Sequence, residues 1–146
     1  MKGARLIQFI LLLAVAVTVN SCSSTQLNKL DGQWQLFWIN DLTDPNIYIW
    51  DFADGQITIT IFEPPSPTNP NPSARLGGQA QYKTRAEFLD AVVQISGYVE
   101  SVSDAKVNAM IHDGDWTIAK IDRDVMRLAT RPDAGGYEIR EFTRVQ

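Results

Sequence analysis

The segment Asn46–Phe62, which reads NIYIWDFADGQITITIF, decides the fold. Large apolar side chains recur at every second position on both sides of Asp54-Gly55: Tyr48, Trp50 and Phe52 before it, and Ile57, Ile59 and Ile61 after it. A period of two is typical of a β-strand with one buried face. Asp-Gly is a favoured two-residue hairpin turn. The segment therefore predicts a β-hairpin of strands 46–52 and 56–62.

Further strand patterns lie on both sides of this hairpin. Upstream, Trp34, Leu36 and Trp38 alternate within residues 33–39. Downstream, we predict strands at 80–84, 92–99, 106–112, 116–121, 125–130 and 137–145. Residues 85–93 fit a short amphipathic helix as well as a strand. Eight or nine short strands separated by turn signals predict an all-β protein, an antiparallel up-and-down barrel of about eight strands with at most one short helix.

Proline dominates the stretch Glu63–Gly78, which carries five prolines among Ser, Thr and Asn residues. Proline cannot donate a hydrogen bond to a neighbouring strand, so we predict a long loop here and no strand. Two interpretations remain open. The loop is either a plain connection between two strands or a lid over the mouth of the barrel.

The N-terminal region has the layout of a secretion signal. Lys2 and Arg5 precede an apolar run over residues 6–19, which is short for a helix that spans a bilayer. The run ends at Val19-Asn20-Ser21-Cys22, which resembles the lipobox of bacterial lipoproteins. That resemblance implies cleavage after residue 21 and diacylation of the Cys22 thiol. The alternative is an ordinary signal with a chance cysteine nearby.

These features divide the chain into a signal peptide (1–21), a lipidated tether (22–29) and one domain (30–146). Two or three acyl chains, at about 0.8 kcal/mol per buried CH₂, attach a protein stably to a membrane. The residues after Cys22 include no acidic signal for export to the surface or for retention in the inner membrane. By resemblance to other lipoproteins, we expect the cell envelope, at the periplasmic face of an outer membrane.

Composition limits the partners of this domain. The chain has a net charge of −4, and loss of Lys2 and Arg5 with the signal makes it more acidic. Nucleic-acid binding requires clustered Lys and Arg, so we expect no nucleic-acid partner. Cys22 is the only cysteine, which excludes an intramolecular disulfide. Stability must therefore come from the core.

The sequence offers little for catalysis or metal binding. His112 is the only histidine, and no Cys–His or Ser–His pair with a sensible spacing accompanies it. His112, Asp113 and Asp115 resemble a turn more than a metal site, because they lack the ligand run and terminal Glu of an EF-hand loop. Asp122 and Asp124 lie in a predicted hairpin tip, where water keeps carboxylates ordinary. We therefore predict no catalytic residue, no metal and no cofactor.

The start of the domain, Leu30-Asp31-Gly32-Gln33-Trp34, resembles the Gly-x-Trp opening of the lipocalins and of bacterial lipocalin-like lipoproteins. In that family the tryptophan plugs the closed end of the barrel beneath an arginine from the last strand. Phe142-Thr143-Arg144 resembles the closing element, and Arg140 shares the face of Arg144. The resemblance therefore implies a closure formed by Gly32, Trp34 and either Arg140 or Arg144, which is a structural role.

The aromatic residues leave two functions open. If the barrel is hollow, one face lines an apolar ligand site made of Trp38, Tyr48, Trp50, Phe52, Ile57, Ile59 and Ile61. The protein would then bind a small apolar ligand or an envelope partner without being an enzyme. If the same side chains fill the barrel, the protein is a structural or interaction lipoprotein with no small-molecule ligand. An enzyme of calycin type would need a nucleophile or base that the sequence does not offer.

Overall fold

The computed structural model describes residues 26–38, 46–68, 70–71, 73–87, 90–101, 111–130 and 138–146. The predicted signal peptide and Cys22 lie outside these residues. The described part contains eight strands: β1 (Gly32–Trp38), β2 (Ile47–Ala53), β3 (Gln56–Glu63), β4 (Ser73–Glu87), β5 (Asp90–Glu100), β6 (Gly114–Ile121), β7 (Val125–Thr130) and β8 (Ile139–Arg144).

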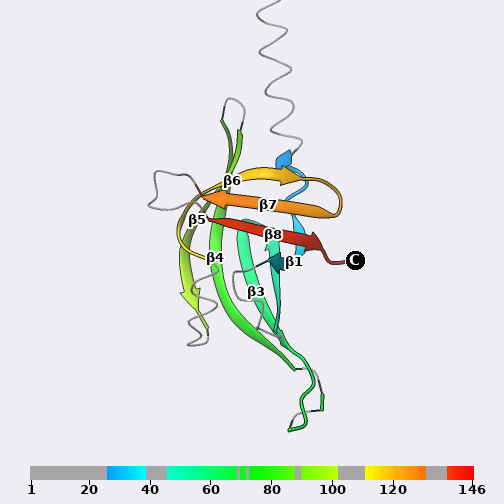
Figure 1. The fold of residues 1–146 in the computed structure, drawn as a ribbon. Helices are drawn as coiled ribbons and strands as arrows, with labels where there is room; N and C mark the ends of the chain where they lie inside the picture. The colour runs from blue at the N-terminus through cyan, green and yellow to red at the C-terminus, as the bar shows by residue number, and fades with distance from the viewer. Residues whose placement is uncertain are drawn as a thin grey trace, which may run out of the picture.

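The eight strands form one closed antiparallel barrel in chain order (Figure 1). Each strand pairs with the next, and β8 returns to pair with β1. The predicted hairpin is present, because Trp50 pairs with Ile59 and Phe52 with Ile57 across the Asp54-Gly55 turn. Asp54 and Gly55 both have positive φ angles, as this kind of turn requires. The predicted all-β, up-and-down barrel is therefore confirmed.

One expectation about a single element was wrong, and one choice that the sequence left open is decided. Ser73–Gly78 belongs to β4 and not to the proline loop, because Ser73 pairs with Glu63 at the end of β3. The prolines end at Pro72, so the chain after it is free to join the sheet. For residues 85–93, where the sequence left helix and strand open, residues 85–87 and 90–93 are strand, while 88–89 lie outside the described residues.

The predicted strand over 106–112 can be compared with the structure only at its last two residues. Ile111 and His112 precede β6 and belong to no strand, and residues 106–110 lie outside the described part. Ile111 lies in the core. Tyr137, the predicted first residue of the last strand, is also outside the described residues.

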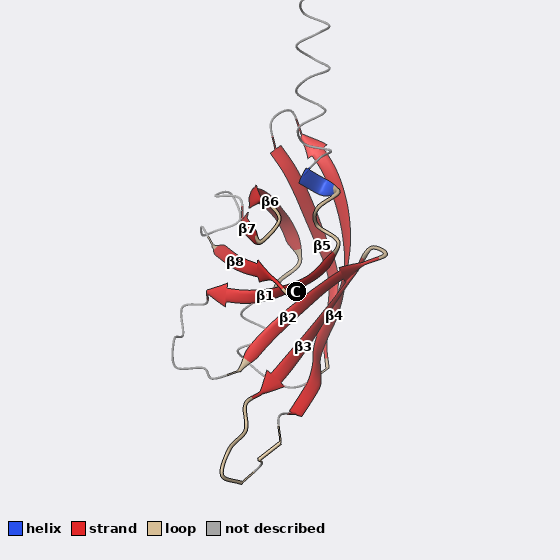
Figure 2. Ribbon diagram, turned by 90° about the vertical axis from the view of Figure 1, so that its right-hand side faces the viewer, coloured by secondary structure: helices blue, strands red, loops and turns tan. Residues whose placement is uncertain are grey.

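The two ends of the barrel differ in how the chain connects the strands (Figure 2). At one end the connections are residues 54–55, 88–89 and 122–124, and we call this the turn end. At the other end they are residues 39–46, 64–72, 101–113 and 131–138, and we call this the loop end. β1 starts at the turn end, so the chain enters the barrel there. All the longer connections therefore gather at the end opposite the entry point.

Candidate functional site

The proposed ligand-lining face lies in the interior of the barrel. Six of its seven members are at most 2% exposed: Tyr48, Trp50, Phe52, Ile57, Ile59 and Ile61. The seventh, Trp38, lies at the loop end of β1, where a register shift makes it the partner of Glu141. Its side chain is outside the described residues. The structure thus brings the predicted face together on β2 and β3.

This interior face is packed by other side chains. The ring of Trp50 meets Phe142 of β8 edge-on, with 5.1 Å between centroids, and Phe52 meets Tyr82 of β4 at 5.4 Å. A cavity of ligand size beside these rings would leave them with surface open to a water molecule, and almost none is open. Edge-to-face contacts at such spacings are typical of a protein core. On this face the barrel is filled.

One polar atom of the interior lacks a hydrogen-bond partner among the described residues. The indole nitrogen Nε1 of Trp50 is buried and donates to no acceptor there. A buried donor without an acceptor destabilises a protein by about 1–3 kcal/mol. This atom is therefore the place in the packed interior where a small acceptor group would gain a hydrogen bond.

The turn end is closed by Trp34 and Arg144. Trp34 is fully buried, and the guanidinium of Arg144 lies 4.1 Å above its ring centroid. Arg144 also donates to three backbone carbonyls, those of Lys29, Asp31 and Arg123. Gly32 has φ +115°, and a Cβ there would lie 2.8 Å from Nη1 of Arg144. Of the two arginines left open by the sequence, Arg144 lies on Trp34.

The same closure fastens the chain that precedes β1. Leu30 is fully buried, and its carbonyl accepts a 2.8 Å hydrogen bond from Nε1 of Trp34. Leu27 packs against the core from a single helical turn. The hydroxyl of Tyr82 donates to Asp31, and burial, together with this bond to a carboxylate, raises the pKa of Tyr82 to about 12. The residues from Leu27 onward are therefore part of the barrel's base.

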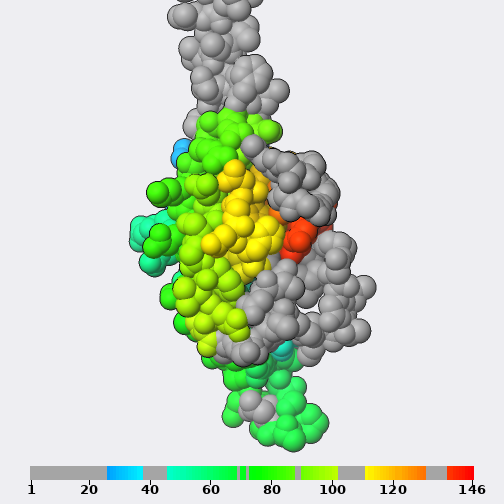
Figure 3. All heavy atoms as spheres, turned by 90° about the vertical axis from the view of Figure 1, so that its left-hand side faces the viewer, coloured from blue at the N-terminus to red at the C-terminus, as the bar shows by residue number. Residues whose placement is uncertain are grey.

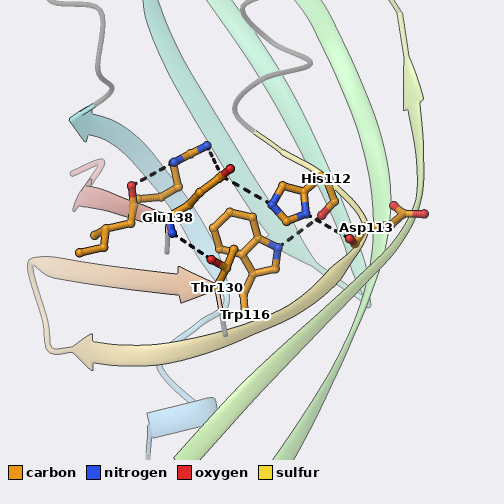
Figure 4. A network of polar contacts seen from close by, with 7 residues as sticks. His112, Asp113, Trp116, Thr130 and Glu138 are labelled. Atoms are coloured by element: carbon orange, nitrogen blue, oxygen red, sulfur yellow. Dashed lines mark hydrogen bonds and ion pairs between the residues drawn. The ribbon is translucent and has the colours of Figure 1, made fainter. Parts of the chain in front are cut away.

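Arg140 takes part in a second network, at the loop end (Figure 4). Its guanidinium lies 5.7 Å from the ring centroid of buried Trp116 and donates to Glu138 Oε2 at 2.8 Å. His112 contacts two other members of this group. Its ring centroid lies 4.8 Å from that of Trp116, and its Nε2 lies 3.5 Å from Glu138 Oε2. The Trp116 indole donates to the His112 carbonyl. We call these four residues the loop-end network.

The polar groups near this network have structural partners. His112 Nδ1 lies 3.1 Å from the carbonyl of Asp113, and the Asp113 carboxylate accepts from the backbone amides of Gly97 and Tyr98. Asp115 pairs with Arg85. Within the described part of the chain, no three His, Cys, Asp or Glu side chains gather as a metal site would require. The polar groups that this network offers to a ligand are the His112 ring and the ion pair between Arg140 and Glu138.

The predicted hairpin tip of β6 and β7 contains a structural carboxylate. The Oδ1 atom of Asp122 accepts hydrogen bonds from the amides of Asp124 and Val125, and these bonds hold the pKa of Asp122 below its ordinary value. A side chain that accepts from the backbone two and three residues ahead is a common turn device. Asp122 therefore stabilises a turn.

An apolar patch on the outer wall was missed by the sequence reasoning. It consists of Phe37 on β1, Ile47 and Ile49 on β2, Phe62 on β3 and Leu76 on β4, and we call it the outer apolar patch. Register joins the members on β2, β3 and β4, because Ile47 pairs with Phe62, while Ile49 and Leu76 both pair with Thr60. Phe37 is 69% exposed, and Ile47 and Leu76 are each 42% exposed. The signal is present in the sequence, because Ile47, Ile49 and Phe62 occupy outward positions where polar residues are expected.

No match to the chain was found among protein-family models, curated proteins or solved structures. Among the described residues, no helix has the length and apolar character needed to cross a membrane. The site is therefore interpreted from its own geometry.

Proposed function

We propose that this chain is a lipid-anchored, non-enzymatic, lipocalin-like protein of the cell envelope that binds an envelope protein through its outer wall. The observation that carries this proposal is the filled interior around Trp50 and Phe52, where a hollow barrel would hold a ligand. A filled barrel is rigid and leaves no room for a ligand inside, so its surface is the part that a partner can contact. The Cys22 lipobox supports the anchor.

The outer apolar patch supports the choice of surface. Outward positions of a small barrel normally face water and are polar, yet here three large apolar side chains, on β1, β2 and β4, are more than one-third exposed. Contiguous exposed apolar residues mark interaction sites. Phe37 and Ile47 lie close to the loop end, so the patch is far from the point where the tether enters. The partner we propose is an envelope protein with an apolar surface of its own.

Site-specific photocrosslinking in the producing cell tests this surface. A benzoylphenylalanine at position 37 should give one discrete crosslinked band, and the same group at exposed Ala119, on the outer face of β6, should not. Ile47→Ser should abolish the band from position 37 without unfolding the barrel, because surface changes alter stability by about 0.5 kcal/mol or less. Equal bands from both positions would contradict the proposal. A band at twice the chain's mass would show that the partner is a second copy of this chain and not another envelope protein.

One observation, the buried indole nitrogen of Trp50, favours a second function, which is the binding of a small apolar ligand. The unpaired Nε1 of Trp50 suits a mostly apolar molecule with a single acceptor, which would enter by displacing interior side chains. Native mass spectrometry of the protein purified from its own envelope would reveal a retained molecule. Under this alternative, Trp50→Phe lowers its occupancy while the barrel stays folded.

A further inference from the structure

The last part of β4 has one strand neighbour instead of two. The last pair that β4 forms with β3 is Gln56 with Gln81, so Lys83–Glu87 pair only with β5. Within the described part of the chain, no strand pairs with their other side. The β4–β5 hairpin extends past β6 in Figure 1, and its green atoms lie above the yellow atoms of β6 in Figure 3. Lys83–Glu87 therefore form an open strand edge, which we call the β4 edge.

The backbone groups that the β4 edge offers belong to Thr84 and Ala86. Tyr82 directs its N–H away from β5, because it donates to the carbonyl of Gly55 at 2.8 Å. Alternate residues of a strand direct their N–H and C=O groups to alternate sides, so Thr84 and Ala86 share the direction of Tyr82. No register shift interrupts the pairing with β5 from Tyr82 onward. The N–H and C=O groups of Thr84 and Ala86 therefore point out of the sheet, where another strand can pair with them.

Charged side chains occupy the alternate positions of this edge. Lys83 is exposed, while Arg85 and Glu87 are half-buried. Arg85 forms ion pairs with Glu87 on its own strand and with Asp115 on β6. Opposite charges on facing strands stabilise their pairing, and like charges destabilise it. The charges therefore select which strand can pair with the β4 edge, and in which register.

The same edge of a second copy of this chain fits these requirements in one register. Two identical edges pair in antiparallel directions about a two-fold axis. An axis at Lys83, Arg85 or Glu87 sets that charged residue opposite its own copy, and an axis at Thr84 sets Lys83 opposite Arg85. An axis at Ala86 instead sets Arg85 of each copy opposite Glu87 of the other. Only this last register places unlike charges, and no like charges, directly opposite each other.

We propose that two copies of this chain pair through the β4 edge on the membrane that anchors them, with Ala86 on the two-fold axis. Ala86 of each copy then exchanges its N–H and C=O hydrogen bonds with Ala86 of the other. A contact between two short strand edges is small, so it forms where lipid anchors keep the copies at a high effective concentration. The inference rests on the proposed anchor at Cys22, and its surface is separate from the outer apolar patch.

Two exposed alanines of β4 allow a matched crosslinking test, Ala86 on the proposed axis and Ala74 near the loop end. The Cα atoms of a hydrogen-bonded antiparallel pair lie about 5.5 Å apart, within the span of about 4.4–6.8 Å that a disulfide bridges. Cys22 carries the acyl chains in the lipidated protein, so the cysteine of Ala86→Cys or Ala74→Cys is the only free thiol. Each variant is reconstituted into vesicles of phosphatidylethanolamine and phosphatidylglycerol and oxidised. We expect the yield of disulfide-linked dimer at position 86 to exceed that at position 74 by roughly threefold or more.

A charge exchange in the Ala86→Cys protein tests the register. Arg85→Glu sets like charges opposite each other and should lower the dimer yield to that of position 74. Adding Glu87→Arg should restore the yield, because the facing charges are again unlike. Both variants lose the ion pair between Arg85 and Asp115, so restoration cannot come from the stability of the barrel. Lys83→Glu makes the same change of charge where no charged residue lies directly opposite, and it should lower the yield less.

Flotation of the same vesicles separates the pairing from the anchor. If the protein floats but positions 86 and 74 give equal yields, the pairing is wrong and the anchor survives. The pairing is also wrong if Arg85→Glu leaves the yield at position 86 unchanged, or if adding Glu87→Arg does not restore it. If the lipidated protein floats no better than Cys22→Ala, the anchor fails and the membrane-dependent pairing falls with it.

Discussion

Both ends of the barrel place an arginine of β8 over a buried tryptophan, yet the two pairs are held in different ways. At the turn end, Arg144 lies on Trp34 and donates to three backbone carbonyls. At the loop end, Arg140 lies near Trp116 and donates to the Glu138 carboxylate and to the carbonyl of its neighbour Ile139. Arg144 thus donates to the backbone of distant segments, whereas the hydrogen bonds of Arg140 described above go to residues one and two positions away.

The difference separates a structural closure from an adaptable one. Carbonyls of a packed backbone cannot rotate away, so Arg144 fixes the position of the chain that precedes β1. The Glu138 side chain is 44% exposed and also meets His112, so its partners can exchange at little cost. The turn end therefore holds the segment before β1 in one position, while the side-chain contacts at the loop end can rearrange.

The largest effect should come from removing the plug of the turn end. Trp34→Ala deletes a fully buried indole that also donates to the Leu30 carbonyl, so we expect a loss of about 3–5 kcal/mol in the free energy of unfolding. Urea unfolding followed by circular dichroism measures this loss. Trp34→Phe, which keeps a buried ring, serves as the matched control and should lose less. A loss below about 1 kcal/mol for Trp34→Ala would show that Trp34 does not act as the plug of the turn end.

A smaller effect should distinguish the two arginines. Arg144→Met removes three solvent-exposed hydrogen bonds to backbone carbonyls, each worth about 0.5–1.5 kcal/mol, so we expect a total loss of about 1–3 kcal/mol. Arg140→Met keeps the apolar stem over Trp116 and removes the ion pair with the half-exposed Glu138 carboxylate, so we expect a smaller loss than for Arg144→Met. Thermal unfolding of both variants under one condition makes the comparison. Equal losses would mean that the two ends are held alike.

The smallest effect concerns pH. The pKa of Tyr82 is raised to about 12 because its phenol is buried and donates to Asp31, so the folded state favours the neutral form. The stability from this group is fully present below pH 10, the ordinary pKa of tyrosine, and is lost as pH rises from 10 to 12. Tyr82→Phe lacks this group, so its unfolding free energy should fall less steeply over that interval. Parallel pH profiles for the two proteins would show that the Tyr82–Asp31 bond does not strengthen the turn end.

The sequence predicted the strands with strict alternation and missed features that depend on register. Alternation around Asp54-Gly55 located β2 and β3 to within one residue, because side chains of one face share a period of two. Composition misassigned Ser73–Gly78, where pairing with β3 outweighs the nearby prolines. The choice between Arg140 and Arg144 also needed the register of β8, since both lie on one face.

The candidate site was less predictable than the fold. Inward positions on β2 and β3 were identified correctly, but whether they line a cavity depends on the volume supplied by Phe142 and Tyr82 from other strands. No local pattern reports that volume. The outer apolar patch was equally hard to predict, because Ile49 and Leu76 lie far apart in the chain and come onto one surface only through their shared partner Thr60 on β3.

The hydrogen bonds of Arg144 also have a consequence for the order of folding. They join residues separated by 113 and 115 positions, nearly the full length of the domain. Contacts of such long range form late, because the entropy of closing the intervening loop must be overcome first. The segment that precedes β1 therefore stays undocked until β8 has folded. Docking of Lys29 and Asp31 on Arg144 then marks the closure of the barrel.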